Sequence, residues 1–365
     1  MMAFVARPTL AATPFFLLPP HISRCGICLA ATVATEVSLP PPPRMPPLAQ
    51  MATLLSVYWL HVARLSEWTL RLPFALSVDV ENIIGVAIVA TSILRSVRRC
   101  SPPVPPPWGR IRTKRTLLIS TVFSLLAAYL FSGYVSTTVD SLLSISEGRG
   151  LRLTVGQHRA THVLLSHLAW VGMAARVLGT RLKPFFPPPF GKGTWLNVRW
   201  RANWLPWAVG GYFASLLSYN AIEGINEHLL PPPPALDPGI AASAVDAAES
   251  VVNRLVHPED GDLIALSIGS IAPCVSAPVF EEVLYRGFLL PSLCRFMPLR
   301  MALPLHALLF GLHHNALPSL LPLSVLGLLW GVLYIRSGNL LVPILVHALW
   351  NSRIFLSSLR DLQMV

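Results

Sequence analysis

The sequence predicts an all-α membrane protein, a polytopic transmembrane helical bundle of about eight spans. Of its 365 residues, 53% are hydrophobic and only 12% are charged, and the mean hydropathy is +0.58. A soluble domain carries about 25% charged residues, so this composition does not suit a water-exposed surface. Several apolar runs reach about 18 to 20 residues, which is the length that crosses a hydrocarbon core as a helix. They are long and continuous, whereas a transmembrane β-barrel shows short alternating strands.

Residues 1–50 are expected to form a transit peptide followed by a Pro-rich spacer. They hold Arg7, Arg24 and Arg44 against a single acid, Glu36. Arg-bearing and acid-poor N-termini are typical of transit peptides, and a run of prolines indicates a spacer. A plastid destination is favoured, with the mitochondrion second. A secretory signal is the rival interpretation, but prolines break the charge-free runs that it would need.

The rest of the chain is expected to form an N-terminal transmembrane region, 51–260, and a core, 261–365. A helix is expected near 78–95, where Asp79 and Glu81 suit a helix N-terminus. The last hydrophobic block is expected to be two helices joined near Ser337 and Gly338. The predicted spans after the first helix are 116–136, 160–179, 203–222, 263–290, 302–317 and 319–357.

Charged residues alternate in sign between successive loops. The loop 95–115 has seven basic residues and no acid, and the loop 180–202 is also basic without acids. The loop 137–159 is mixed, and 223–262 has eight acids and one arginine. Lys and Arg gather on the inner side of membranes, so the basic loops are expected to face the stroma, or the cytosol if there is no plastid targeting. The net charge of +11 is explained by these loops, and no nucleic-acid partner is expected.

Three polar clusters interrupt the apolar C-terminal part. From Leu263 to Phe280 there is no charged residue, and after the adjacent Glu281 and Glu282 no acid appears before Asp361. Charges within a membrane cost about 2.5–3.5 kcal/mol each and are usually functional. The clusters are EEVLYR at 281–286, FGLHH at 310–314 and HALWN at 347–351.

Helical spacing assigns different roles to the residues of the first cluster. Glu282 and Arg286 stand at i and i+4, where they can pair on one face. Glu281 then lies on another face with Tyr285 and is available for chemistry. The Glu282–Arg286 pair could also have a purely structural role, and two adjacent glutamates can simply mark the start of a helix.

The second and third clusters add histidines and an amide. His314, His347 and Glu281 could hold a metal ion with a water as the fourth ligand. The same groups could instead polarise a water without a metal, with Asn351 donating to an oxyanion. No cofactor is favoured, although a divalent metal such as Zn stays possible. His347 and Asn351 could also act only as interhelical hydrogen-bonding residues. Other histidines, at positions 162, 167 and 306, are expected to be satisfied core or interface residues.

The order EExxYR, FxxxH and HxxxN resembles the CAAX-protease and bacteriocin-processing family of intramembrane proteases, the type II CAAX prenyl endopeptidase group. The resemblance covers about 263–357, and the upstream half looks like the plant plastid branch. It implies that Glu281 activates water, that His314 shares that water or a metal, and that His347 and Asn351 form an oxyanion hole. Glu282, Arg286 and Tyr285 would orient the site.

The resemblance implies an intramembrane endopeptidase in a multi-pass chloroplast membrane, with the thylakoid favoured over the envelope. Its partners would be the lipid bilayer and a membrane-bound peptide substrate. The alternative is a plastid membrane scaffold or regulator without proteolysis, acting on chlorophyll metabolism through a plastid protein partner. The loops 95–115 and 180–202 favour this alternative, since they could dock an acidic protein.

Overall fold

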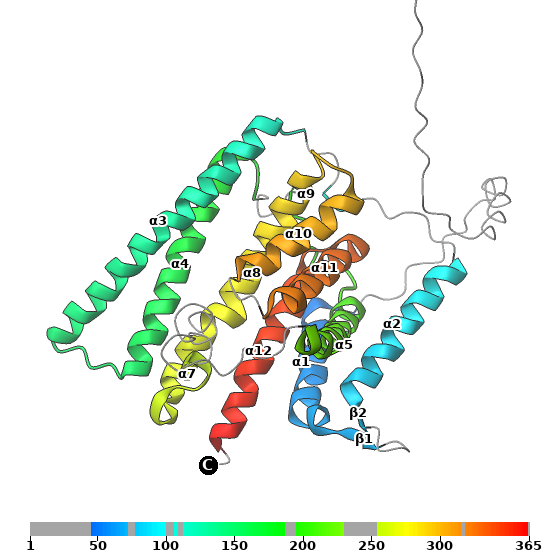
Figure 1. The fold of residues 1–365 in the computed structure, drawn as a ribbon, viewed down its shortest axis with the longest axis horizontal. Coiled ribbons are helices and arrows are strands. Elements are labelled where there is room, and N and C mark those ends of the chain that lie inside the picture. The colour runs from blue at the N-terminus through cyan, green and yellow to red at the C-terminus, as the bar shows by residue number, and fades with distance from the viewer. Residues whose placement is uncertain are drawn as a thin grey trace, which may run out of the picture. The chain divides into compact units, whose positions relative to one another are not determined.

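A computed structural model describes residues 45–71, 77–99, 106–108, 112–186, 195–229, 254–314 and 318–363. The predicted leader before residue 45 lies outside these residues, as does Arg110 in the first basic loop. The described part is almost entirely helical, which confirms the all-α class (Figure 1).

Eleven α-helices are described in these ranges. They are α1 (Pro47–Ala63), α2 (Val80–Arg99), α3 (Arg115–Gly148), α4 (Val155–Arg181), α5 (Leu205–Leu229), α7 (Leu263–Ile271), α8 (Ala277–Glu282), α9 (Leu290–Leu293), α10 (Leu299–His313), α11 (Leu320–Ser337) and α12 (Leu341–Gln363). Two π-helical segments, η4 (Ala272–Ser276) and η5 (Val283–Leu289), and two short 3₁₀ turns, η2 (Leu65–Glu67) and η3 (Glu259–Gly261), complete the helical structure. Short strands β1 (Thr69–Arg71) and β2 (Ser77–Asp79) pair antiparallel.

The membrane character follows from helix length and composition. Among the described residues, four helical stretches are long and apolar enough to cross a membrane, and two shorter apolar helices accompany them. The four are Arg115–Gly148, Val155–Arg181, Leu263–Leu293 and Leu320–Ser337, and the shorter ones are Leu299–His313 and Leu341–Ser357. At 1.5 Å per residue α3 is about 50 Å long, more than a hydrocarbon core requires. The total of about eight spans stays a prediction.

Most element predictions agree with the structure, and one helix is new. The expected joint within 319–357 is confirmed, because Gly338 takes a left-handed conformation (φ 60°) and ends α11. Gly is the residue that adopts this conformation at little cost. The helix α1 was not predicted, and it begins at Pro47, inside the stretch 1–50. Proline suits the first turn of a helix, where its missing N–H is not needed.

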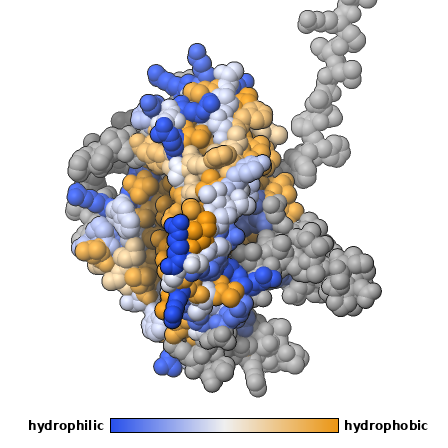
Figure 2. Space-filling model, turned by 90° about the vertical axis from the view of Figure 1, so that its left-hand side faces the viewer, coloured by the Kyte–Doolittle hydropathy of each residue, from blue (hydrophilic) through white to orange (hydrophobic). Residues whose placement is uncertain are grey.

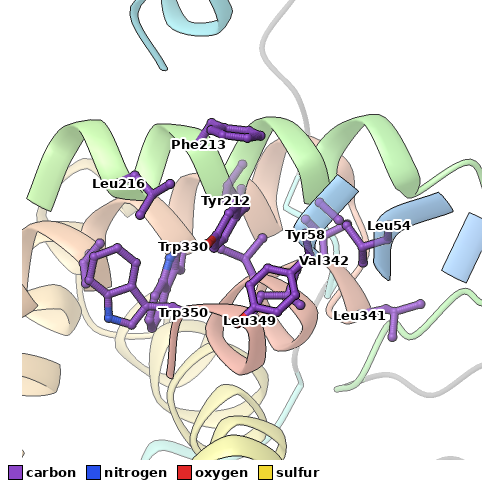
Figure 3. Packing of buried hydrophobic residues seen from close by; sticks show 14 of the residues in the cluster. Leu54, Tyr58, Tyr212, Phe213, Leu216, Trp330, Leu341, Val342, Leu349 and Trp350 are labelled. Atoms are coloured by element: carbon purple, nitrogen blue, oxygen red, sulfur yellow. The ribbon is translucent and has the colours of Figure 1, made fainter. Parts of the chain in front are cut away.

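The main core surrounds α5, which packs against α2, α11 and α12. Figure 3 shows Tyr212 and Leu216 of α5 beside Trp330 of α11 and Leu349 of α12. These side chains are buried, and complete burial of one large apolar side chain contributes about 1.5–3 kcal/mol. The core therefore fixes α11 and α12 relative to α5.

Small residues bring α10 and α11 close together. A Cβ atom on Gly327 would lie 3.2 Å from the carbonyl oxygen of Ala307, and one on Gly331 would lie 2.7 Å from a Leu303 methyl group. Membrane helices often use such small residues four apart to let backbones approach. The close approach places the backbone of α11 next to the polar residues described below.

A buried polar junction joins four helices and was not predicted. Glu81 of α2 accepts hydrogen bonds from His61 Nε2 of α1 (3.0 Å) and from Asn220 Nδ2 of α5 (2.9 Å). Arg353 Nη2 of α12 lies 3.3 Å from the same carboxylate, and Tyr212 donates to His61 Nδ1 (3.0 Å). We call these five residues the Glu81 junction. It ties α1 and α2 to the last helix.

The helix α3 presents much apolar surface outward. Its contacts are mainly with α4, and Phe123, Leu130 and Tyr134 are each more than half exposed. Figure 2 views the side on which α3 lies in Figure 1 and shows hydrophobic areas interspersed with hydrophilic residues, several of which lie at the upper end. A membrane protein faces lipid with such a surface.

The two ends of the α3–α4 hairpin differ in charge, because one is basic and the other carries acidic as well as basic residues. At the start of α3, Arg181 donates to Ser120 Oγ (3.1 Å). At the other end, His158 bridges Asp140 (3.0 Å) and Glu147 (2.9 Å). This separation agrees with the alternating signs of the loops, whereas the membrane side that each end faces stays a prediction.

Asp262 fastens the start of α4 to α7. Its carboxylate accepts from the backbone N–H groups of Ile264 and Ala265, both at 2.9 Å, which makes it the N-cap of α7. It also accepts from the Thr154 hydroxyl (2.6 Å) and from Gln157 Nε2 (2.8 Å). One side chain thus satisfies donors of two helices.

We expect Asp262→Ala to lower the thermal unfolding midpoint in detergent, because an N-cap acceptor is lost. The Thr154 hydroxyl, followed by the backbone of Ala265, holds the pKa of Asp262 below its usual range. A lowered pKa gives stability that is present above the unfolded value, near pH 4, and is lost as the pH falls through the folded pKa. The difference between wild type and variant should therefore be full at pH 7 and shrink below about pH 4. An Asp262→Asn control keeps an acceptor oxygen and should lose less at pH 7. A difference that persists unchanged below pH 3 would contradict this role of the charge.

Candidate functional site

The glutamate pair lies in a continuous helical stretch that contains two widened turns. The segment Leu263–Leu293 runs through α7, η4, α8, η5 and α9, and η4 and η5 flank the short helix α8 that ends at Glu282. Prolines at 273 and 278 lie in or beside these turns and cannot donate the usual helical hydrogen bond. Single π turns inside α-helices frequently occur at functional sites.

Glu282 and Arg286 form the predicted ion pair, and both are fully buried. Arg286 Nη1 donates to Glu282 Oε1 at 2.9 Å, and Nη2 donates to the carbonyl oxygen of Gly327 at 2.9 Å. The guanidinium carbon also lies 4.6 Å from the ring centroid of Phe310 and 5.6 Å from that of Trp330. A buried charge needs such pairing and hydrogen bonding to be tolerated. This arrangement therefore locks α8 and η5 to α10 and α11.

His347 of α12 is held by the same carboxylate. Its Nδ1 donates to Glu282 Oε1 at 3.1 Å, and its ring stacks on Trp330 with centroids 4.3 Å apart. Trp330 is itself fixed because its Nε1 donates to Ser215 Oγ of α5 at 3.0 Å. Since a carboxylate only accepts, Nδ1 carries a proton. When the imidazole is neutral, Nε2 is therefore an acceptor that points away from Glu282.

Glu281 faces that free nitrogen. Its Oε2 lies 4.0 Å from His347 Nε2, which is too long for a direct hydrogen bond. Oε2 is buried and has no hydrogen-bond partner among the described residues. At this distance the carboxylate and the imidazole do not bond to each other directly, whereas one water molecule between them would form a hydrogen bond with both. Glu281 and His347 can thus hold one water molecule, which donates one hydrogen to each of them.

His314 and Asn351 are fixed through main-chain carbonyl groups. His314 Nδ1 donates to the Phe310 carbonyl at 2.9 Å, and Asn351 Nδ2 donates to the Pro273 carbonyl at 2.7 Å. Both side chains are half-buried. The rings of His314, Phe310 and His347 form a series, with successive centroids 5.0 Å and 6.1 Å apart. The structure therefore brings Glu281, Glu282, Arg286 and His347 into direct reach and places His314 one aromatic ring farther away.

Tyr285 lies against α10. Its ring makes edge contacts with Phe310 (5.1 Å between centroids) and lies 6.0 Å from His313. Apart from the Arg286 guanidinium carbon, 6.0 Å from its ring centroid, the described contacts of Tyr285 are with α10. Its predicted orienting role stays a prediction. His306 is fully buried, as expected of a core histidine, yet neither ring nitrogen has a hydrogen-bond partner among the described residues.

Within the described residues, no three side chains of His, Cys, Asp or Glu are arranged to hold a metal ion. His347 uses one nitrogen for Glu282, and His314 uses one for the Phe310 carbonyl. Each histidine keeps its other nitrogen, and each ring is oriented by the hydrogen bond of the first.

Three supporting residues were missed in the sequence. Trp330 stacks on His347, Ser215 fixes Trp330, and Gly327 supplies a carbonyl oxygen to Arg286. The pattern GLLWG at 327–331 was a usable signal, because small residues four apart mark close helix contacts in membranes. Ser215 in an apolar helix has no comparable signal.

Comparison with known families gave one match. The family described as Type II CAAX prenyl endopeptidase Rce1-like matches residues 264–353, which is less than half of the chain. Neither the curated proteins nor the solved structures gave a match. The matched segment begins at α7, contains the glutamate pair, His314, His347 and Asn351, and ends at Arg353 of the Glu81 junction. The similarity indicates a CAAX protease-like function within a membrane.

Proposed function

We propose that the protein is an intramembrane endopeptidase in which Glu281 and His347 activate a water molecule. The proposal is supported by the similarity of residues 264–353 to type II CAAX prenyl endopeptidases. The single observation that carries it is the 4.0 Å separation between Glu281 Oε2 and His347 Nε2, with the remaining nitrogen of His347 bound to Glu282.

In this mechanism the water donates one hydrogen to Glu281 and the other to His347 Nε2. Its oxygen attacks the carbonyl carbon of the substrate peptide bond, and Glu281 takes the proton that is released. The same proton then passes to the leaving nitrogen as the C–N bond breaks. Glu282 keeps His347 in the tautomer that accepts at Nε2, which is a positioning role.

The negative charge that develops on the carbonyl oxygen requires donors. Asn351 has two amide hydrogens, and only one is used for the Pro273 carbonyl. We assign the second to the oxyanion. His314, with its Nδ1 fixed, would present Nε2 toward the water or the leaving group. Tyr285 and Arg286 would maintain the shape of the site.

The test is hydrolysis of a peptide with a lipid-modified C-terminal region by the purified protein in nanodiscs. The assay buffer is prepared with H₂¹⁸O. We expect one ¹⁸O atom in the newly formed carboxyl group and a loss of rate of at least about 100-fold for Glu281→Gln, since general-base catalysis contributes 10²–10⁴-fold. Arg201→Gln at the exposed basic end is the matched control and should retain the rate. Equal rates for Glu281→Gln and wild type would refute the assignment of the base.

We further propose a multi-pass plastid membrane as the location, on the basis of the composition of residues 1–50. Its substrates would then be membrane-bound plastid peptides.

A second candidate function is a scaffold that docks an acidic plastid protein, for instance in chlorophyll metabolism. It is supported by the exposed Arg112 and Lys114. Neutralising these two residues should abolish partner co-purification if the scaffold is correct, whereas Glu281→Gln should leave it intact.

A further inference from the structure

Two arginines at the basic end of the bundle lack an acidic partner. Arg115 begins α3, and Arg295 lies in the turn between α9 and α10. Neither forms an ion pair with any acid in the described part of the chain, where the ion pairs of Arg159, Arg286 and Arg353 are found elsewhere. We call Arg115 and Arg295 the arginine pair.

The side chain of Arg115 is held in place by neutral groups. Its Nε donates to the main-chain carbonyl of Arg295 at 3.0 Å, and its guanidinium carbon lies 5.4 Å from the ring centroid of Phe296. Because Nε is used, the two terminal NH₂ groups remain for a ligand. Arg295 is half-buried, and its Nε is buried without a partner among the described residues. Guanidinium groups recognise phosphate and carboxylate through paired N–H donors.

An apolar stripe continues from Arg115 along α3. Ile119, Val122 and Leu126 follow it at i+4, i+7 and i+11, so all four residues share one face. Each of the three apolar residues is about half exposed. The stripe lies on the same helix as the exposed apolar residues described above. A cation at the end of an exposed apolar stripe is complementary to an anionic lipid, which has a charged headgroup and an apolar acyl chain.

We propose that the arginine pair binds the anionic headgroup of a membrane lipid whose acyl chain lies along the α3 stripe. The arginines supply charge and paired donors, Phe296 supports one guanidinium, and the stripe supplies the apolar surface. Basic residues at the membrane surface attract anionic lipids, and the effect accumulates with each residue. This site is independent of the hydrolytic chemistry, since neither arginine contacts the glutamate pair.

Lipid is favoured over an acidic protein because the arginine pair adjoins an apolar face. A docking surface for a soluble acidic partner would be expected on exposed basic residues that precede the helix, such as Arg112 and Lys114. A free inorganic phosphate would use the same donors but would gain nothing from the stripe. The three occupants therefore respond differently to changes in the stripe and in the ligand.

The experiment measures lipid binding to the purified full-length protein in detergent by native mass spectrometry. The probes are phosphatidylglycerol, phosphatidylcholine and inorganic phosphate. We expect the apparent Kd for phosphatidylglycerol to rise about tenfold in the double variant Arg115→Gln, Arg295→Gln, because each basic residue strengthens binding several-fold. The matched control is Arg336→Gln, an exposed arginine in the last turn of α11, which should change this Kd less than about twofold.

A second variant, Val122→Ser with Leu126→Ser, separates lipid from free anion. It should also weaken phosphatidylglycerol binding, while inorganic phosphate should fail to displace the lipid at comparable concentration. Three results would each overturn the proposal. They are equal effects of the arginine pair and of Arg336, equal affinity for phosphatidylcholine and phosphatidylglycerol in wild type, and displacement of the lipid by inorganic phosphate or by an oligoglutamate peptide at lipid-like concentration.

Discussion

Replacing Arg286 with Met is expected to reduce the free energy of unfolding by about 3–5 kcal/mol, since it leaves a buried carboxylate without its counter-ion. Glu282 and Arg286 are both fully buried, and Nη1 lies 2.9 Å from the carboxylate. The variant also loses the bond to the Gly327 carbonyl and the stacking on Phe310. The measurement is reversible unfolding in mixed micelles.

A double variant separates the charge from the packing. In Glu282→Gln with Arg286→Met, the amide oxygen still accepts from His347 Nδ1, and neither member of the former ion pair carries a charge. We expect this double variant to recover a large part of the stability that the single variant loses, because neutral replacement of a buried pair is often nearly neutral. A single variant within about 1 kcal/mol of wild type, or a double variant no better than the single, would contradict the account of the pair.

Glu81→Ala is expected to cost a similar amount, about 3–5 kcal/mol, through the Glu81 junction. The substitution removes the only carboxylate that Arg353 and the fully buried His61 reach in the described structure. It also leaves Asn220 without that acceptor. Loss of the junction should loosen α1 and α2 from α12, which can be measured as faster amide hydrogen exchange in α1.

The matched control is Glu223→Ala, a half-buried glutamate on α5 with no described ion pair. It should change stability by less than about 0.5 kcal/mol. Glu81→Gln is the conservative variant, and it keeps an acceptor oxygen for Asn220. Should Glu81→Ala and Glu223→Ala have equal effects, the junction would not be a stabilising element.

Local spacing was sufficient for some features of the site. Glu282 and Arg286 stand one turn apart on the same helical stretch, so their pairing follows from i and i+4 spacing. The joint at Gly338 also followed from local sequence. Apolar runs long enough to cross a membrane predicted the all-α class, because hydropathy depends on neighbouring residues alone.

Contacts between distant segments were beyond this approach. His347 reaches Glu282 across 65 residues, and Arg353 reaches Glu81 across 272. Neither pairing leaves a trace in periodicity, since it depends on which helix faces which. The helix α1 was missed for another reason, because its start at Pro47 follows a run of prolines that resembles a spacer. The π turns beside the glutamate pair depend on tertiary packing as well as on proline, so local sequence did not predict them.

The central claim is that Glu281, facing His347 Nε2, performs the chemistry rather than stabilising the bundle. The most direct measurement is rescue of cells that lack the protein by the Glu281→Gln variant, with membrane accumulation quantified in the same cells. The account predicts loss of rescue at a protein level equal to wild type, with full rescue by Arg201→Gln. Full rescue by Glu281→Gln at that level would contradict it.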